Sequence, residues 1–301
     1  MSKPKSPLFS LGAHGTIGDS LTYQERSGVD FVRQKPIPTD RYTLAQAYHR
    51  WDYQWYALQW HALSAAEKLA YRKLGSTCGI TGFNYYMKVA LNTLPDLVAR
   101  WHLDEAAGTV AYDSSKSGYN GDIFGALHVP GVISNALWFD NLDDYINCGV
   151  CPLLNFTDED FTIIAWLKPY GALSGAICSQ MNAIYTGGYI LGHSSGVKTY
   201  LRQADNIGYS DTIGGALTID SWNHLAVVRQ MGHVGRVYIN GVDTTTSPST
   251  KAMTLTTRRF EIADWSLGAG WEFPGSIDEL AIFNRALSQE EVQILYERSY
   301  P

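Results

Sequence analysis

The feature that most constrains the fold is a series of short apolar runs between residues 101 and 301, separated by turn-forming residues. In runs such as Phe161–Leu167 and Trp222–Arg229, apolar side chains recur at a spacing of two, the period of a β-strand. Asn240-Gly241, between two further runs, is a strong signal for a two-residue hairpin turn. Many short strands with turns between them predict a mainly β fold, an antiparallel β-sandwich or barrel.

The end of the chain predicts one strand and one helix. Ser276–Phe283 has the apolar content of a strand and contains two adjacent carboxylates, Asp278 and Glu279. Because neighbouring strand residues point to opposite faces, one of the two must face the core or an ion. Ser288 and Glu291 form a capping box at the start of a short helix.

The first third of the chain predicts a different, smaller module. Two alternating runs within residues 20–33, on either side of Ser27-Gly28, predict a β-hairpin. Such a hairpin is a candidate for pairing with another chain's sheet edge. About three short helices follow it. Thr43 caps the first, which carries Trp51 and Trp55, and Ser64 with Glu67 forms a capping box for the second.

We therefore expect two domains. Residues 1–97 form an α+β module of a hairpin and about three short helices, and residues 98–301 form the sandwich. The charge supports this division: residues 1–100 contain 12 Lys/Arg and 7 Asp/Glu (+5), whereas residues 101–301 contain 11 and 22 (−11), which together give the net charge of −6.

Composition excludes several classes of function. The basic residues form no run, which argues against nucleic-acid binding. No stretch approaches the roughly 20 apolar residues of a membrane helix. Met1–Pro7 begins with charge but no apolar core follows, so we expect no signal peptide. Few charged residues (17%) and many aromatic ones (13%) are typical of surfaces that bind sugars or protein partners.

The cysteines give a weak signal. Cys148 and Cys151 form a lone CxxC without a second pair, so buried or free thiols explain them better than zinc or redox chemistry. A disulfide between Cys148 and Cys178 stays open at this stage.

Six ordered blocks of the last two-thirds resemble one family. They include Leu-Asp-Glu followed by Asp-Ser-Ser, Ala-Leu-Trp-Phe-Asp, Val-Tyr-Ile-Asn-Gly-Val and Gly-Ser-Ile-Asp-Glu-Leu. The blocks are Leu103–Gly121, Gly131–Ile146, Phe161–Pro169, Trp222–Val227, Val237–Val242 and Gly275–Glu290. Residues 100–298 thus resemble a laminin G-like jelly-roll domain of the concanavalin A-like lectin and glucanase folds. Separately, Trp60–Met87 resembles a small module of uncharacterised phage and bacterial structural proteins.

The resemblance implies a structural Ca²⁺ that ties the first loop to the last strand. Asp113 and Asp278 match the family's motif aspartates, and Asn120 is the most plausible source of a further oxygen ligand. Two alternatives stay open. Backbone N–H groups could cap both carboxylates, or Lys116 could take the place of the cation.

The same resemblance implies glycan binding. Aromatic residues near predicted loops are the candidate sugar platforms: Tyr185, Tyr209, Trp265 and Trp271. Hydrolysis is not expected, because neither Glu261 with Asp264 nor Glu272 with Asp278 reproduces the paired carboxylates of glucanases. In particular, a spacing of three puts Glu261 and Asp264 on opposite faces of a strand. The scattered histidines are expected to be satisfied polar residues: His102, His128, His193, His224 and His233.

The favoured function is that of a non-enzymatic structural or adhesion protein. We expect a virion component, a phage capsid decoration or tail protein, whose first module docks to structural proteins of the particle. Its jelly roll would be displayed outward and could bind glycans. The alternative is a soluble or cell-surface carbohydrate-binding lectin. The expected location is the virion or an extracellular surface, and both hypotheses are compatible with a homo-oligomer.

Overall fold

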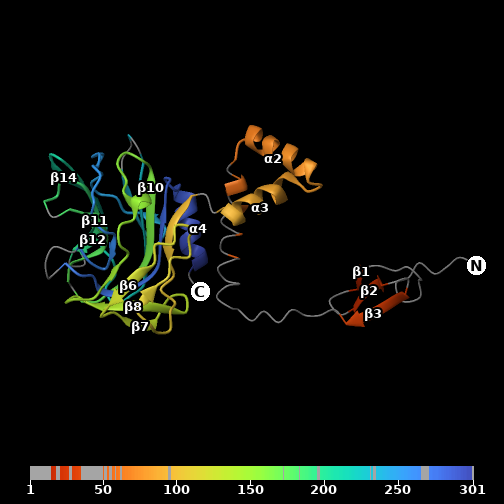
Figure 1. Cartoon of the computed structure of the whole chain (residues 1–301), viewed down its shortest axis with the longest axis horizontal. Helices are drawn as coiled ribbons and strands as arrows, with labels where there is room; N and C mark the ends of the chain where they lie inside the picture. Colours follow the sequence, from red (N-terminus) through yellow and green to blue (C-terminus); the bar gives the residue numbers. More distant parts are fainter. Residues whose placement is uncertain are drawn as a thin grey trace, which may run out of the picture. The chain divides into compact units, whose positions relative to one another are not determined.

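A computed structural model describes most of the chain and divides it into two compact units, residues 1–48 and 49–301 (Figure 1). The described residues are 15–17, 21–26, 29–34, 50, 53, 56–57, 59–61, 63–93, 96–171, 173–182, 184–194, 197–230, 232, 235–265 and 271–299. The predicted boundary between residues 97 and 98 stays a prediction about domains.

The first unit contains the predicted hairpin. Strands β2 (Leu21–Arg26) and β3 (Val29–Gln34) pair antiparallel, and β1 (Gly15–Ile17) joins β2 on its other side. The turn at residues 27–28 and the cap Thr43 lie outside the described residues. So do Trp51 and Trp55, although the described positions between 50 and 61 are helical.

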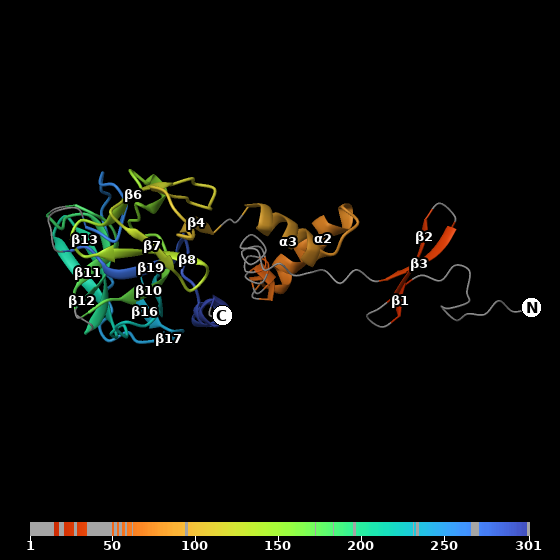
Figure 2. The same cartoon turned by 90° about the horizontal axis from the view of Figure 1, so that it is seen from below.

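The second unit contains a sandwich of two eight-stranded antiparallel sheets, as predicted (Figure 2). The β19 sheet has the order β17-β16-β15-β10-β19-β8-β7, and β4 also pairs with β19. Its strands are β4 (Leu97–Trp101), β7 (Leu127–Pro130), β8 (Asn135–Asp140), β10 (Phe161–Pro169), β15 (Asn223–Arg229), β16 (Arg236–Ile239), β17 (Val242–Asp243) and β19 (Pro274–Phe283).

The β12 sheet has the order β14-β13-β12-β11-β18-β9-β6-β5. Its strands are β5 (Val110–Ala111), β6 (Gly121–Phe124), β9 (Tyr145–Asn147), β11 (Gly175–Met181), β12 (Gly188–Ser194), β13 (Lys198–Asp205), β14 (Gly208–Gly214) and β18 (Glu261–Ile262). A single 3-10 turn, η1 (Pro152–Leu154), is also described.

The main core fills the space between the two sheets. Alternate residues of each strand point into it, such as Leu137 and Phe139 of β8, while the residue between them points outward. At one end Trp101 stacks on Phe260, with ring centroids 5.5 Å apart and planes 10° apart. The alternation therefore gives each sheet one apolar face for the core and one outer face for other contacts.

A second apolar cluster covers much of the outer face of the β19 sheet. Ile164, Ala281 and Phe283 from the sheet are buried with Tyr86 of α3 (Gly82–Thr93) and Leu295 of α4 (Gln289–Ser299). The N-terminal helices thus share a core with the sandwich, and α2 (Ala65–Thr77) adds Tyr71 to its rim.

A polar network ties the same parts together. The Arg285 guanidinium donates to both Glu291 oxygens at 2.9 Å and to Asp96 at 3.3 Å. The Gln59 amide donates to Glu291 as well. Such two-pronged Arg–carboxylate pairs are stronger than neutral hydrogen bonds.

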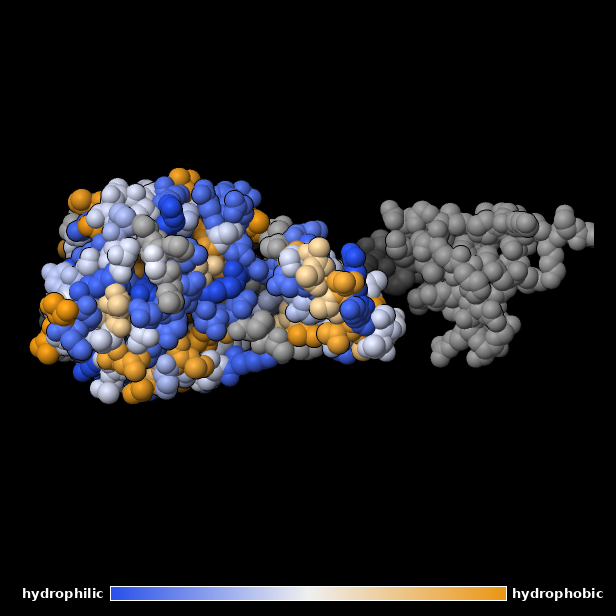
Figure 3. Space-filling model, turned by 90° about the horizontal axis from the view of Figure 1, so that it is seen from above, coloured by the Kyte–Doolittle hydropathy of each residue, from blue (hydrophilic) through white to orange (hydrophobic). Residues whose placement is uncertain are grey.

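Local signals in the sequence are confirmed. Ser64 caps α2 with Glu67 in a full capping box, and Ser288 and Glu291 exchange the same pair of bonds at α4. Asn240 and Gly241 both have positive φ (51° and 77°), as a type I′ turn requires. None of the described helices is both long and apolar enough to cross a membrane. Apolar residues are scattered among polar ones over the visible face (Figure 3).

Candidate functional site

The four aromatic residues predicted to bind glycans lie together. Between ring centroids, Tyr185 is 5.2 Å from Tyr209 and 4.8 Å from Trp265, and Trp265 is 5.8 Å from Trp271. They come from three segments that are distant in sequence: the connection between β11 and β12, strand β14, and the segment between β18 and β19. We call these four residues the aromatic face.

The aromatic face lies on the outer side of the β12 sheet. Leu201 of β13 points into the main core, whereas its neighbour Tyr200 belongs to a separate cluster with Trp265. Arg202, two residues after Tyr200, points the same way. Its guanidinium carbon is 4.1 Å from the ring centroid of Tyr209. The strand alternation thus places an arginine beside the rings.

Arg202 is fixed by an ion pair with its cross-strand partner. It opposes Asp211 of β14, and its Nε and Nη2 each donate to an Asp211 oxygen at 2.9 Å. Its guanidinium also lies 5.5 Å from the ring centroid of Tyr185. An arginine held at both carboxylate oxygens cannot swing away, so the rings around it are preorganised.

Two of the rings are available to a ligand and one is not. Tyr209 is 51% exposed and Trp271 is 38% exposed, whereas Trp265 is only 5% exposed. The Trp265 indole N–H has no partner among the described residues. Trp265 therefore supports the surface from below, and Tyr209 and Trp271 offer their faces outward.

A small cavity of about 140 Å³ adjoins Trp271. Its lining brings together hydroxyl, ammonium, guanidinium and carboxylate groups beside two aromatic rings. The lining residues are Ser174, His193, Ser194, Lys198, Tyr200, Arg202, Asp211 and Trp271. The hydroxyls of Ser174 and Ser194 are 3.5 Å apart, and Lys198 forms no ion pair among the described residues.

His193 of this cavity differs from the expectation of a satisfied polar residue. It is 1% exposed, and neither ring nitrogen has a partner in the described part of the chain. Burial lowers the pKa of His193 to about 4, so the ring is neutral at physiological pH. A neutral imidazole offers one donor and one acceptor. His233, another of the predicted histidines, lies outside the described residues.

Two of the residues predicted to bind calcium are engaged by protein donors. The Asp113 carboxylate accepts from the N–H groups of Arg100, Ser115 and Tyr119 at 2.8–2.9 Å and from the Ser115 hydroxyl at 2.8 Å. The Asn120 side-chain oxygen accepts from the Asp113 N–H at 2.9 Å. This arrangement matches the capping alternative, because four donors use the four lone-pair sites of a carboxylate.

Asp278, the third predicted ligand, is in different surroundings. One oxygen accepts from the N–H groups of Val132 and Ile133 at 2.7 and 3.1 Å, and the other has no partner among the described residues. Burial and the neighbouring Glu279 raise the pKa of Asp278 to about 8. Asp113 and Asp278 thus accept hydrogen bonds from different segments of the chain. Calcium binding by Asp113, Asn120 and Asp278 stays a prediction.

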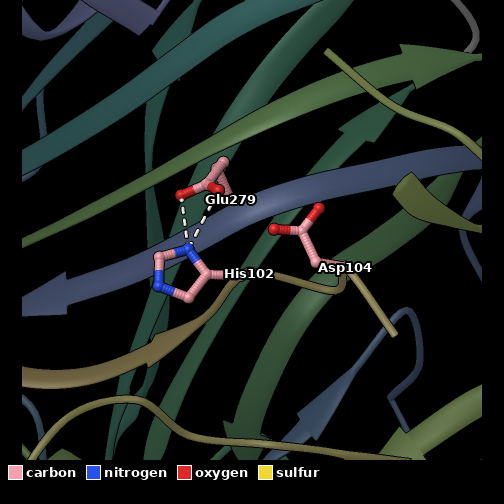
Figure 4. A group of neighbouring side chains, drawn as sticks. All are labelled: His102, Asp104 and Glu279. Carbon is pink, nitrogen blue, oxygen red and sulfur yellow. Dashed lines mark hydrogen bonds and ion pairs between the residues drawn. The ribbon is translucent and has the colours of Figure 1, made fainter. Parts of the chain in front are cut away.

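A group that sequence reasoning did not find lies next to Asp278. His102 and Asp104, just after β4, face Glu279 of β19, and the ligand atoms of all three lie within 4.8 Å of one another (Figure 4). His102 Nδ1 is 2.9 and 3.0 Å from the two Glu279 oxygens. Arg100 adds a contact at 3.7 Å. We call His102, Asp104 and Glu279 the His102 cluster.

A β-bulge creates the His102 cluster. The register between β10 and β19 shifts between Ile164 and Trp166, and Glu279 has a left-handed φ of 50°. The extra residue turns Glu279 toward the segment that follows β4. Burial and Glu279 together raise the pKa of Asp104 to about 6, and one Asp104 oxygen has no described partner. The Leu-Asp-Glu motif at residues 103–105 was the available sequence signal for this group.

The carboxylates considered for hydrolysis are buried. Glu261, Asp264 and Glu272 are all less than 9% exposed. Ala263 has a left-handed φ of 66°, so strand alternation does not hold between Glu261 and Asp264. Burial, Glu261 and Glu272 raise the pKa of Asp264 to about 6. The argument that a spacing of three places Glu261 and Asp264 on opposite faces of a strand therefore does not apply to this pair.

All four cysteines are free thiols, three of them buried in or near the main core: Cys148, Cys151 and Cys178. Burial raises the pKa of Cys151 to about 12 and that of Cys178 further still. The expectation of buried thiols is confirmed.

The profile of the concanavalin A-like lectin/glucanases superfamily matches residues 140–293. The chain belongs to this superfamily. A comparison with curated proteins gives no match.

Solved structures show the same fold at low identity. Domain 4 of AbnA, an extracellular GH43 arabinanase from Geobacillus stearothermophilus in complex with arabinotriose, is 20% identical, with a TM-score of 0.55 over 67% of this chain and 98% of that one. The binding domain of Paraclostridial Mosquitocidal Protein 1 is 19% identical (TM-score 0.55, 67% and 52%). The receptor binding domain of botulinum neurotoxin D is 17% identical (0.51, 67% and 52%). The match thus spans about half the length of the last two structures.

We predict that His193 makes the protein less stable in acid. Its pKa is lowered on folding, so the unfolded chain binds the proton first, and stability is lost as pH falls from about 6.5 towards 4, on the order of 3 kcal/mol at full effect. His193→Phe should therefore flatten the dependence of unfolding free energy on pH between 4 and 6.5. His224, whose pKa burial lowers to about 3, leaves a residual slope. Equal slopes in denaturant titrations of both proteins would show that the histidine is not responsible.

Proposed function

We propose that the protein is a non-enzymatic carbohydrate-binding protein that uses the aromatic face and the adjoining cavity. The observation that carries this proposal is the convergence of Tyr185, Tyr209, Trp265 and Trp271 from three distant segments onto one outer sheet face. Trp265 packs in a small apolar cluster beneath this face, whereas Tyr209 and Trp271 are 51% and 38% exposed. Exposed rings beside polar groups are the usual construction of a sugar site.

The chemistry of each group suggests its role in sugar binding. The apolar face of a sugar ring stacks on Trp271 or Tyr209, the two exposed rings. The sugar hydroxyls then reach the cavity, where Ser174, Ser194 and Lys198 provide hydrogen-bonding groups. The ion pair between Arg202 and Asp211 keeps this surface rigid, which lowers the entropy lost on binding.

Binding rather than hydrolysis is supported by the state of the carboxylates. A glycosidase needs two carboxyl groups that contact the scissile bond. Glu261 is 2% exposed and ion-paired with Arg259, and Asp264 and Glu272 are also buried. None of the three lines the cavity.

The structural neighbours add support of a general kind. One is a domain solved with arabinotriose, and two others are described as the binding domain of a mosquitocidal protein and the receptor binding domain of a botulinum neurotoxin. These properties belong to those proteins. They make arabinotriose a reasonable first probe here, and N-acetylneuraminic acid, present in another neurotoxin D structure, a reasonable second.

Truncation of Trp271 should weaken glycan binding strongly. We expect Trp271→Ala and Tyr209→Ala each to cost about 2 kcal/mol or more, because buried aromatic anchors dominate binding energy. The measurement is isothermal titration of the full chain with arabinotriose, N-acetylneuraminic acid and hits from a glycan array. Tyr112→Ala, at an exposed tyrosine outside this surface (59% exposed), is the matched control. Unchanged affinity in both variants would rule out the aromatic face.

The sequence predicts attachment through residues 1–97, and we propose that residues 1–48 carry this role. Residues 1–48 form a compact unit of their own with a three-stranded sheet, which is compatible with docking to a particle. The specific partner would be a structural protein of a virion or surface assembly, with the sandwich displayed outward.

Removal of residues 1–48 tests this role. The full chain should co-sediment with purified virions or surface assemblies of its source, and the truncated chain should not. Glycan binding should survive the truncation, because the aromatic face lies wholly within residues 49–301. Co-sedimentation of the truncated chain at the full-length level would refute docking through this unit.

We also propose a structural Ca²⁺ beside the bulge of β19 rather than at Asp113. Ca²⁺ binds six to eight oxygens, most of them from carboxylates and carbonyls. Asp104 and Asp278 each have a carboxylate oxygen without a partner in the described part of the chain. Glu279 directly follows Asp278 in sequence, and its ligand atom lies within 4.8 Å of that of Asp104. Asp113 and Asn120, in contrast, are engaged by N–H donors. Bound Ca²⁺ would neutralise the repulsion among the three carboxylates.

Added Ca²⁺ should raise the unfolding temperature of the protein. At a hundredfold excess over Kd, the stabilisation by mass action is about 2.7 kcal/mol. Glu279→Gln should abolish this rise, and Asn120→Ala should keep it. Thermal unfolding in EDTA and in CaCl₂ makes the comparison. No rise in the wild-type protein argues against calcium altogether, and loss of the rise in Asn120→Ala alone returns the ion to the residues predicted from sequence.

A further inference from the structure

A second cavity lies on the opposite sheet and has a volume of about 450 Å³. This volume is within the range of roughly 300–1,000 Å³ that is common for small-molecule sites. Two aromatic rings, one ammonium group and one carboxylate are among the groups that line it. The lining residues are Val129, Pro130, Trp138, Lys168, Pro169, Tyr170, Asp220 and Ser276. We call this cavity the Trp138 groove.

The register of three strands forms the groove. Trp138 of β8 opposes Ser276 of β19, and Ser276 opposes Lys168 of β10. Their neighbours Leu137, Ile277 and Leu167 all point into the main core, so these three point outward. A small residue thus stands between two long ones on adjacent strands, whose backbones lie roughly 10 Å apart at two strand spacings. Ser276 is the floor, and Trp138 and Lys168 are the walls.

Backbone hydrogen bonds hold the end of the groove in place. The Tyr170 N–H donates to the Pro274 carbonyl at 2.8 Å, and the Asp220 N–H donates to the Pro169 carbonyl at 2.8 Å. Asp220 has a left-handed φ of 57°, a conformation that aspartate tolerates better than most residues. The Tyr170 side chain, 63% exposed, is therefore attached to a fixed backbone.

The polar groups of the groove are available. Among the described residues, neither the Lys168 ammonium nor the Asp220 carboxylate forms an ion pair or a side-chain hydrogen bond. One offers three donors and the other accepts only, so together they complement the hydroxyls of a diol, each of which donates and accepts. Their charges cancel, which favours a neutral ligand over an acidic one. Trp138, partly buried, presents an apolar surface between them and the β7 edge.

We propose that the Trp138 groove is a second saccharide site, which takes a neutral sugar residue stacked on Trp138 and hydrogen-bonded to Lys168 and Asp220. This site is independent of the aromatic face, since it lies on the outer side of the β19 sheet and shares no residue with that face. Helix α4 and the N-terminal helices pack on the neighbouring part of this sheet, around Ile164 and Phe283. The groove is lined instead by residues of β7 and β8 and by one end each of β10 and β19. One sandwich then binds sugar on both of its outer faces.

A glycan array with neutral and acidic oligosaccharides tests the proposal, probed with the labelled full chain and followed by titration calorimetry on the strongest neutral binder. Trp138→Ala should weaken that binding by about 30-fold, the loss typical of an aromatic anchor. Lys168→Ala and Asp220→Asn, both at exposed positions, should weaken it about 3- to 10-fold without affecting folding. Tyr112→Ala is the control for an exposed ring outside the groove.

The outcomes separate this site from the aromatic face. Loss in Trp138→Ala, Lys168→Ala and Asp220→Asn for a set of neutral glycans that Trp271→Ala still binds supports the Trp138 groove. Wild-type binding of every glycan by Lys168→Ala, Asp220→Asn and Trp138→Ala overturns it, and loss in Trp271→Ala alone then leaves the aromatic face as the single site. A wild-type chain that binds no glycan overturns both proposals.

Discussion

The hydrogen-bond ladder of β19 is the interaction on which the rest of the sandwich depends. This ten-residue strand is buried along its whole length and pairs with β10, β8 and β4. It therefore joins β4, the first strand of the sandwich, to the central strand β10. More than half of the chain lies between β4 and β19 in sequence. Because β19 pairs with three other strands, a shift in its register would change which of its residues face the core and which face outward in all three pairings. The Trp138 groove and the His102 cluster both use side chains of this strand.

The outer faces of the two sheets can carry polar and aromatic groups because inward-facing residues already fill the core. Leu137, Leu201 and Ile277 supply the buried surface from one side of their strands, so the residues between them are free for other contacts. On the β12 sheet these include Tyr200 and Arg202. On the β19 sheet part of the outer face is itself apolar and buried under helices. The sandwich thus has one face closed in part by helices and one face open beside its aromatic residues.

What the sequence predicts well is local. Residues that follow one another decide the caps at Ser64 and Ser288 and the turn at Asn240, and the strand period identifies most strands. The four aromatic residues were predicted one by one from positions near predicted loops, and the sequence did not indicate that they lie together. The bulge at Glu279 and the left-handed Ala263 could not be predicted, since both depend on partner strands. For the same reason the His102 cluster, built across 177 residues of chain, was missed.

The buried contact between the helices and the β19 sheet limits how this chain can be recombined. Tyr86 and Leu295 share one apolar cluster with Phe283. A cut between α3 and β4 would therefore expose apolar surface on both fragments. A cut near residue 48 falls instead at the boundary between the two compact units. Natural or engineered exchange of the leading segment should therefore preserve the helices with the sandwich. The N-terminal helices thus pack as part of the same unit as the sandwich and are not a separable attachment module.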